Sequence, residues 1–345
     1  MTTLPAPQGP GASAADPSSA LLEVTDLRVQ FATAAGPITP VDGLSFTVAP
    51  GETLAVLGES GSGKSVTAQA VMGLLPRPAG RVTGGRIVYD GVDLLTRPAA
   101  QVRRLRGPEM AMVFQDPLCS LNPVFRVGAQ IGEMFRRHRG ASRRQAKAAA
   151  VDLMKRVGIP DAAKRVDDYP HQFSGGMRQR VVIAMAIALD PRLLIADEPT
   201  TALDVTVQAQ IMNLLAGLQQ EYGMAMVLIT HDLGVVADVA DRMLLVYAGR
   251  AAETGRIREV YERPAHPYAA GLMASLPGVA GDQERLTPIP GAPPNLAALP
   301  SGCPFHPRCP YAVDRCRAER PPLRAVSGAG RAAACHRAEE VLDGG

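Results

Sequence analysis

Short apolar runs bounded by polar residues dominate the middle of the chain. Four of these runs, each four or five residues long, are Leu54–Leu57, Met110–Phe114, Leu193–Ala196 and Met226–Thr230. Continuous apolar runs of this length are typical of strands buried on both faces of a parallel sheet. The stretch after the first run, Val66–Leu75, has a helix-like pattern. The pattern therefore predicts an α/β core.

A glycine-rich segment separates the first predicted strand from this helix. Residues 58–65 read Gly-Glu-Ser-Gly-Ser-Gly-Lys-Ser, a full match to the phosphate-binding pattern G-x-x-x-x-G-K-[ST]. In a strand–loop–helix context, successive backbone N–H groups and the helix N-terminus converge on a polyphosphate, Lys64 reaches the β- and γ-phosphates, and the Ser65 hydroxyl binds Mg²⁺. We therefore predict binding of ATP and Mg²⁺. The predicted nucleotide contacts of the loop are Gly58, Ser60, Gly61, Ser62, Gly63, Lys64, Ser65 and Val66.

The other three apolar runs each end in a polar residue suited to catalysis. These residues are Gln115, the pair Asp197 and Glu198, and His231. Ligands of open α/β sheets bind at the carboxyl ends of the strands, so these side chains are expected around one γ-phosphate. Asp197 would bind Mg²⁺, and Glu198 would orient or deprotonate the attacking water. Gln115 would contact Mg²⁺ and this water, and His231 the γ-phosphate. A single histidine at a strand end is more often structural, but the ordered set favours catalysis.

Two further motifs point to a family. The segment Ser174-Gly175-Gly176-Met177 resembles the signature of ATP-binding cassette (ABC) ATPases, and 201–204, ending in Asp204, resembles their D-loop. The phrasing of residues 173–180 and 196–210 is similar to the D-type ATPase subunit of oligopeptide and dipeptide importers. This resemblance covers about residues 21–345.

The resemblance implies a fold and a domain order. The expected fold is an α/β P-loop NTPase (RecA-like) core with an antiparallel β layer, a helical insert and a small Cys-containing C-terminal extension. The expected ABC ATPase domain spans 21–255, with the insert at about 116–180, and the extension spans 256–345. Short strand patterns at 21–52 and 84–94 fit the β layer. Residues 1–20, rich in Pro, Ala, Gly and Ser, are expected to be a disordered lead-in.

The signature implies a partner subunit. Gly175 and Gly176 lack a Cβ and can approach a phosphate closely, although Ser174 can equally cap the following helix. Met177 stands where most signatures carry glutamine, a substitution that D-type subunits share. Because family members place the signature on a separate helical insert, the resemblance implies a head-to-tail dimer in which each ATP contacts the partner's signature. The expected partners are an F-type ATPase subunit, two transmembrane permease subunits and, through them, an extracytoplasmic substrate-binding protein.

Hydropathy and charge limit the classes of protein to which the chain can belong. No apolar run approaches membrane-spanning length, the net charge is only +3, and no basic, aromatic-rich module indicates nucleic-acid binding. These features agree with what the resemblance implies, an ATPase bound peripherally at the cytoplasmic face of the cell membrane that powers peptide uptake. The alternative is a soluble ABC ATPase of DNA repair or translation.

Phe31, about 27 residues before the loop, is the candidate to stack on adenine, with a core-strand role as the alternative.

The extension carries four of the five cysteines. Cys303, Cys309, Cys316 and Cys335 follow the pattern C-x5-C-x6-C-x18-C, which matches neither the paired spacing of common zinc sites nor the usual ferredoxin run. Four thiols in a cytosolic chain favour metal ligation over disulfides. The resemblance to close relatives implies a four-iron four-sulfur (4Fe-4S) cluster at these positions; zinc and unligated thiols are the alternatives.

Overall fold

The computed structural model describes residues 20–34, 36–275, 288–326 and 330–344, so nearly all of the predicted lead-in lies outside the described residues. The strands are β1 (Leu22–Thr33), β2 (Gly36–Val48), β3 (Thr53–Leu57), β4 (Gly80–Tyr89), β5 (Val92–Asp93), β6 (Met110–Val113), β7 (Leu193–Asp197), β8 (Ala225–Thr230), β9 (Arg242–Tyr247), β10 (Arg250–Arg256), β11 (Arg324–Ala325) and β12 (Ala332–Ala333). The α-helices are α1 (Lys64–Val71), α2 (Ala99–Leu105), α3 (Pro117–Ser120), α4 (Val127–Arg139), α5 (Arg143–Arg156), α6 (Ala162–Arg165), α7 (Gly175–Ile187), α8 (Val205–Tyr222), α9 (Leu233–Val236), α10 (Ile257–Glu262), α11 (Pro267–Ala274), α12 (Asp314–Ala318) and α13 (Ala338–Gly344). Three short 3-10 turns are η2 (Leu94–Thr96), η3 (Pro170–Gln172) and η4 (His306–Arg308).

The core is a mixed sheet with the strand order β11-β12-β10-β9-β3-β8-β7-β6. Strands β9, β3, β8, β7 and β6 are parallel, and the remaining three are added antiparallel at one edge. The four predicted buried runs are the parallel strands β3, β6, β7 and β8. Their carboxyl ends therefore lie at one edge of the sheet, where the candidate catalytic residues follow.

Each face of the core sheet packs against a different layer. On β3, Leu54 and Val56 pack in a hydrophobic cluster with residues of β1, β2 and β4. Ala55 and Leu57 point to the other face and pack in a cluster with residues of helices such as α7 and α8. Side chains of a strand alternate between faces, so a strand covered on both faces must be apolar throughout. This explains why β3 reads as an uninterrupted apolar run.

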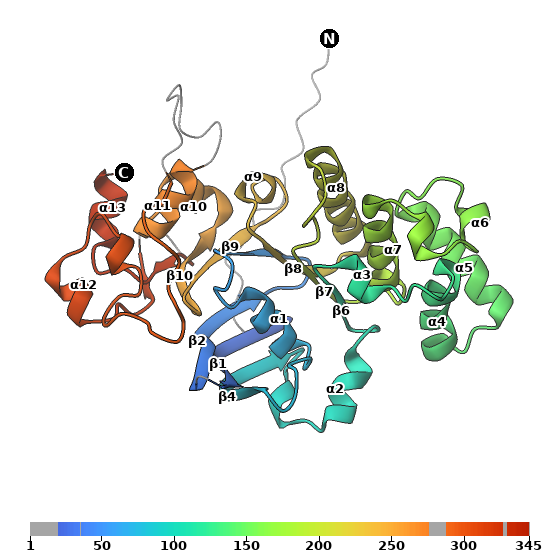
Figure 1. The fold of residues 1–345 in the computed structure, drawn as a ribbon, viewed down its shortest axis with the longest axis horizontal. Helices are drawn as coiled ribbons and strands as arrows, with labels where there is room; N and C mark the ends of the chain where they lie inside the picture. The colour runs from blue at the N-terminus through green and yellow to red at the C-terminus, as the bar shows by residue number, and fades with distance from the viewer. Residues whose placement is uncertain (1–19, 35, 276–287, 327–329, 345) are drawn as a thin grey trace, which may run out of the picture.

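The smaller sheet is antiparallel, with the order β2-β1-β4-β5. Strands β1 and β2 form a hairpin in which Thr33 pairs with Gly36. In Figure 1 this blue layer lies against the core next to α1. The predicted α/β P-loop architecture with an antiparallel β layer is confirmed.

The helical insert and the C-terminal extension lie at opposite ends of the molecule (Figure 1). The insert contains α3 to α6 and leads into α7, and its helices α4 and α5 pack against each other. No helix among the described residues combines the length and apolarity needed to cross a membrane.

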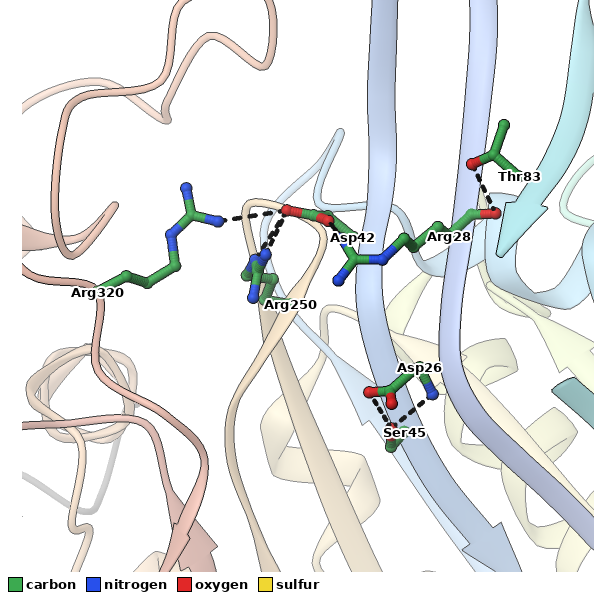
Figure 2. A network of polar contacts seen from close by, with 7 residues as sticks. All are labelled: Asp26, Arg28, Asp42, Ser45, Thr83, Arg250 and Arg320. Atoms are coloured by element: carbon green, nitrogen blue, oxygen red, sulfur yellow. Dashed lines mark hydrogen bonds and ion pairs between the residues drawn. The ribbon is translucent and has the colours of Figure 1, made fainter. Parts of the chain in front are cut away.

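The extension is joined to the core sheet. Its strands β12 and β11 continue the sheet beyond β10, and Arg331 forms a buried ion pair with Glu253 of β10, with the closest atoms 2.8 Å apart. A second anchor lies on β2, where Asp42 accepts hydrogen bonds from Arg320 of the extension and from Arg250 (Figure 2). The extension thus docks on both sheets.

Candidate active site

The phosphate-binding loop connects β3 to α1, as its motif predicts. Gly63 is the N-cap of α1 and has a φ of 101°. A Cβ at this position would lie 2.1 Å from the Pro40 carbonyl oxygen of β2, so only glycine fits. The loop is therefore pressed against the antiparallel layer, with the N-terminus of α1 open toward the carboxyl edge of the core sheet.

Lys64 holds the loop together from within. The residue is only 4% exposed, and its Nζ donates hydrogen bonds to the carbonyl oxygens of Gly58 (2.7 Å) and Glu59 (3.0 Å). Burial lowers the pKa of Lys64, while the carboxylates of Glu198 and Asp197 act in the opposite direction. A buried ammonium is suited to pairing with a phosphate oxygen, although the two nearby carboxylates partly neutralise its charge.

Ser65 and Asp197 form the candidate metal-binding pair. The Ser65 hydroxyl donates a hydrogen bond to Asp197 Oδ1 at 2.9 Å, joining the start of α1 to the end of β7. Burial raises the pKa of Asp197, partly opposed by the Ser65 hydrogen bond. A hydroxyl and a carboxylate are oxygen ligands of the kind that Mg²⁺ prefers, so the residues present fit this ion.

Glu198 is the centre of the polar cluster at the strand ends. Its Oε2 accepts hydrogen bonds from Gln115 Nε2 and from Thr201 Oγ1, both at 2.9 Å, and lies 3.6 Å from His231 Nδ1. The structure thus brings together all four residues that the strand-end pattern selected. Thr201 was predicted as part of the D-loop segment and not as a partner of this carboxylate.

A cavity of about 390 Å³ opens beside the loop. It is lined by Phe31, Ile38, Pro40, Ser60, Gly61, Ser62, Gly63, Lys64, Ser65, Val66, Glu198 and Leu296. The buried Ser62 Oγ has no hydrogen-bond partner in the described structure, which fits a loop built to receive a polar ligand. Phe31 lines the cavity and also packs against the core of the β layer, so the two roles weighed for it are compatible.

The signature and the D-loop are not among the described residues that line this cavity. The Ser174 hydroxyl accepts a hydrogen bond from Met177 N and caps α7, and Asp204 caps α8 in the same way. The two segments instead lie against each other, because a Cβ on Gly175 would lie 3.4 Å from Cδ2 of Leu203 in the D-loop. Signature and D-loop therefore lie side by side within this chain.

Three residues that sequence reasoning missed contact one another at the phosphate loop. Glu59, at a free position of the motif, forms a two-pronged ion pair with Arg308 of the extension, and its backbone N–H donates to the Tyr268 hydroxyl. No local pattern marks Arg308, which lies 249 residues further along the chain.

The iron–sulfur prediction is wrong. The four cysteines of the extension line one cavity of only about 10 Å³, but no group of three or more His, Cys, Asp or Glu residues in the described part of the chain is placed to hold a metal ion. Burial raises the pKa of the Cys309 and Cys335 thiols to about 11, so both are neutral near pH 7. The relatives below are named as ATP-binding proteins without reference to a cluster.

Together, the fold and this site define a P-loop ATPase of the ATP-binding cassette class. Residues 41–201 match the ABC transporter family, and residues 252–316 match the oligopeptide/dipeptide transporter C-terminal region. The chain therefore belongs to the oligopeptide/dipeptide group of ABC transporter ATPases, which confirms the resemblance.

Individual relatives agree with this assignment. The oligopeptide transport ATP-binding protein OppD of Salmonella typhimurium is 51% identical, with 95% of this chain and 97% of that protein covered. The dipeptide transport ATP-binding protein DppD of Escherichia coli is 51% identical, with 92% and 96% covered. Among solved structures, a dimeric ATP-binding cassette in a post-hydrolysis state, bound to ADP and Pi, is 26% identical with a TM-score of 0.62, covering 69% of this chain and 99% of that one.

Proposed function

We propose that this chain hydrolyses ATP to power the uptake of oligopeptides or dipeptides by an ABC importer at the cytoplasmic face of the cell membrane. The observation that carries the proposal is the Glu198 carboxylate, held by Gln115 and Thr201 at the cavity that contains Lys64. The peptide cargo rests on similarity to the transport proteins named above.

Each residue of the site has a role in this proposal. The loop amides and Lys64 bind the phosphates, and Ser65, Asp197 and Gln115 hold Mg²⁺, which neutralises phosphate charge during transfer. Glu198 orients the attacking water and accepts its proton, while His231 contacts the γ-phosphate. Phe31 stacks on the adenine.

The signature acts on the partner's nucleotide. Ser174 and Gly175 are exposed, and none of the described residues lining the chain's own cavity belongs to the signature. Beside Asp204, the apolar Val205 is 82% exposed, which is typical of a residue that a partner covers. We assign the partner as a related F-type ATPase subunit in a head-to-tail dimer.

An exposed apolar segment supports docking to membrane subunits. Leu118, Val124 and Phe125 are 61%, 71% and 57% exposed, and they follow Gln115 at the start of the helical insert. Clusters of exposed large apolar side chains mark interaction surfaces. Because Gln115 bonds to Glu198, contact with the two permease subunits at this surface would be transmitted to the catalytic carboxylate. The substrate-binding protein would reach the chain only through these permeases.

Co-purification tests the proposed assembly. The chain is expressed with its candidate permease and ATPase partners, and ATP hydrolysis is measured in liposomes with and without peptide-loaded binding protein. We expect a membrane complex whose ATPase rate rises with loaded binding protein and falls in the Phe125→Ser variant. The matched control is Val313→Ser, an exposed apolar residue of the extension. Recovery of a soluble ATPase that nucleic acid stimulates would instead support the DNA-repair or translation alternative.

A further inference from the structure

The C-terminal extension reaches into the nucleotide site. Arg308, at the end of η4, donates to the Glu59 carboxylate through Nη1 at 2.7 Å and through Nη2 at 2.9 Å. Arg308 is only 8% exposed, so its guanidinium is shielded from solvent, whereas the Glu59 carboxylate is partly exposed. Such charge-assisted pairs fix geometry as well as supplying energy.

Glu59 is held by its backbone as well as by its side chain. Its N–H donates to the hydroxyl of Tyr268 at 2.9 Å, and the Tyr268 ring is fully buried against Tyr247 and Phe305. The Arg308 guanidinium lies 5.9 Å from the ring centres of both Tyr247 and Phe305, and its Nε donates to the Pro290 carbonyl. The two aromatic rings beside Arg308 and the Tyr268 hydrogen bond to Glu59 leave little freedom for either residue.

These contacts are connected to Lys64 through Glu59. The Lys64 ammonium donates to the Glu59 carbonyl, so the residue held by the extension also holds the lysine. Leu296 of the extension lines the same cavity as Phe31 and the loop. The extension therefore contacts the nucleotide site twice, at the phosphate-binding loop through Arg308 and at the lining of the cavity through Leu296.

We propose that the extension positions the phosphate-binding loop for ATP through the Arg308–Glu59 pair, so that ATP affinity depends on this one contact. This inference rests on the proposed function of the loop as the ATP site. Arg308 is a positioning residue, acting through Glu59 and not on the nucleotide. Loss of the pair frees the loop, which must then be ordered again when ATP binds.

The chain supplies a matched control. Arg331 forms a pair with Glu253 that is more deeply buried and also anchors the extension, but to β10 and away from the loop. If Arg308 served only to attach the extension, Arg331→Met and Arg308→Met would have the same consequences. If Arg308 positions the loop, then of two variants with the same overall stability only Arg308→Met changes the ATP affinity and the hydrogen exchange of the loop.

The test compares Arg308→Met, Glu59→Gln, their double variant and Arg331→Met in the full chain. Equilibrium titration with MgATP, thermal unfolding without nucleotide and hydrogen exchange of residues 58–66 are measured. We expect about tenfold weaker ATP binding and faster loop exchange in Arg308→Met and Glu59→Gln, with no further loss in the double variant. Arg331→Met should lower the unfolding temperature without changing the ATP affinity of the folded protein.

Glu59→Gln keeps the test decisive if Arg308→Met does not fold, because the Glu59 side chain is partly exposed and its amide replacement has the same shape. Unchanged affinity and loop exchange in folded Glu59→Gln would overturn the positioning role, as would equal weakening by Arg331→Met. A wild-type chain that does not bind MgATP would overturn the proposed function itself.

Discussion

Glu198 adopts a backbone conformation that is unusual for its residue type. Its φ is 44°, in the left-handed region, where a non-glycine residue costs about 1–3 kcal/mol. The conformation is held by a hydrogen bond from Glu198 N to the Ile229 carbonyl at 2.8 Å and by the donors Gln115 and Thr201 on its carboxylate. The strained backbone turns the carboxylate from the end of β7 into the cavity beside Lys64.

Replacing Glu198 by glutamine tests the role of this carboxylate. Glu198→Gln keeps the shape and one acceptor oxygen but cannot take a proton from water, so we expect normal ATP affinity and roughly 10²-fold or more slower hydrolysis in the assembled complex. The measurement is phosphate release alongside nucleotide titration, with the exposed Glu221→Gln on α8 as the control. Near-normal turnover would remove Glu198 from the role.

At the scale of elements, the extension depends on a buried histidine at the start of α11. His266 is 3% exposed, and its Nδ1 accepts a hydrogen bond from Tyr268 N as the helix cap. Burial lowers the pKa of His266 to about 4, although a hydrogen bond with the Ala334 backbone acts in the other direction. The ring is therefore neutral in the folded chain, and its cap places Tyr268 against the phosphate loop.

This histidine makes docking of the extension sensitive to acid. The unfolded chain binds a proton at a pKa near 6.5, so stability from His266 is complete above that pH and declines toward pH 4, by up to about 3 kcal/mol. His266→Asn keeps a capping acceptor and does not titrate. Thermal unfolding at pH 7.5 and pH 5 should show the wild type losing more stability than the variant. Parallel losses in the two proteins would contradict the assignment.

At the scale of the whole molecule, the core sheet packs against the antiparallel layer on one face and against helices on the other, and the helical insert and the C-terminal extension are attached to this core. The insert and the extension lie at opposite ends (Figure 1), and no described residue of the signature on α7 lines the cavity at the phosphate loop. The exposed Gly175 and Val205 lie at the contact between α7 and α8, where the proposed partner would bind. ATP hydrolysis by this arrangement would require two cassettes.

Gly175→Asp tests the contact between subunits. The nearest atom to a Cβ at Gly175 is Leu203 Cδ2 at 3.4 Å, so the variant has room to fold. A carboxylate there would face the partner's γ-phosphate, and we expect at least about tenfold weaker ATP-driven closure with nucleotide binding at Lys64 retained. Cross-linking reports closure and titration reports binding. The control is Gly217→Asp, on exposed surface of α8 with open space around its Cβ. Joint loss of binding and closure in folded Gly175→Asp would contradict action in trans.

The sequence by itself determined the parts of this protein whose structure is local. Residues 58–65 form the expected loop because the glycine positions and the flanking strand and helix are encoded within a few residues. The runs at β6, β7 and β8 predicted buried parallel strands, and parallel strands necessarily bring Gln115, Glu198 and His231 to one edge. These inferences needed periodicity and strand direction only.

Tertiary structure alone decided the contacts between distant segments. Arg308 and Glu59 lie 249 residues apart, and no spacing along the chain encodes their contact. The cysteine pattern misled for the same reason, because metal ligation requires side chains to converge in space and the described residues offer no such group.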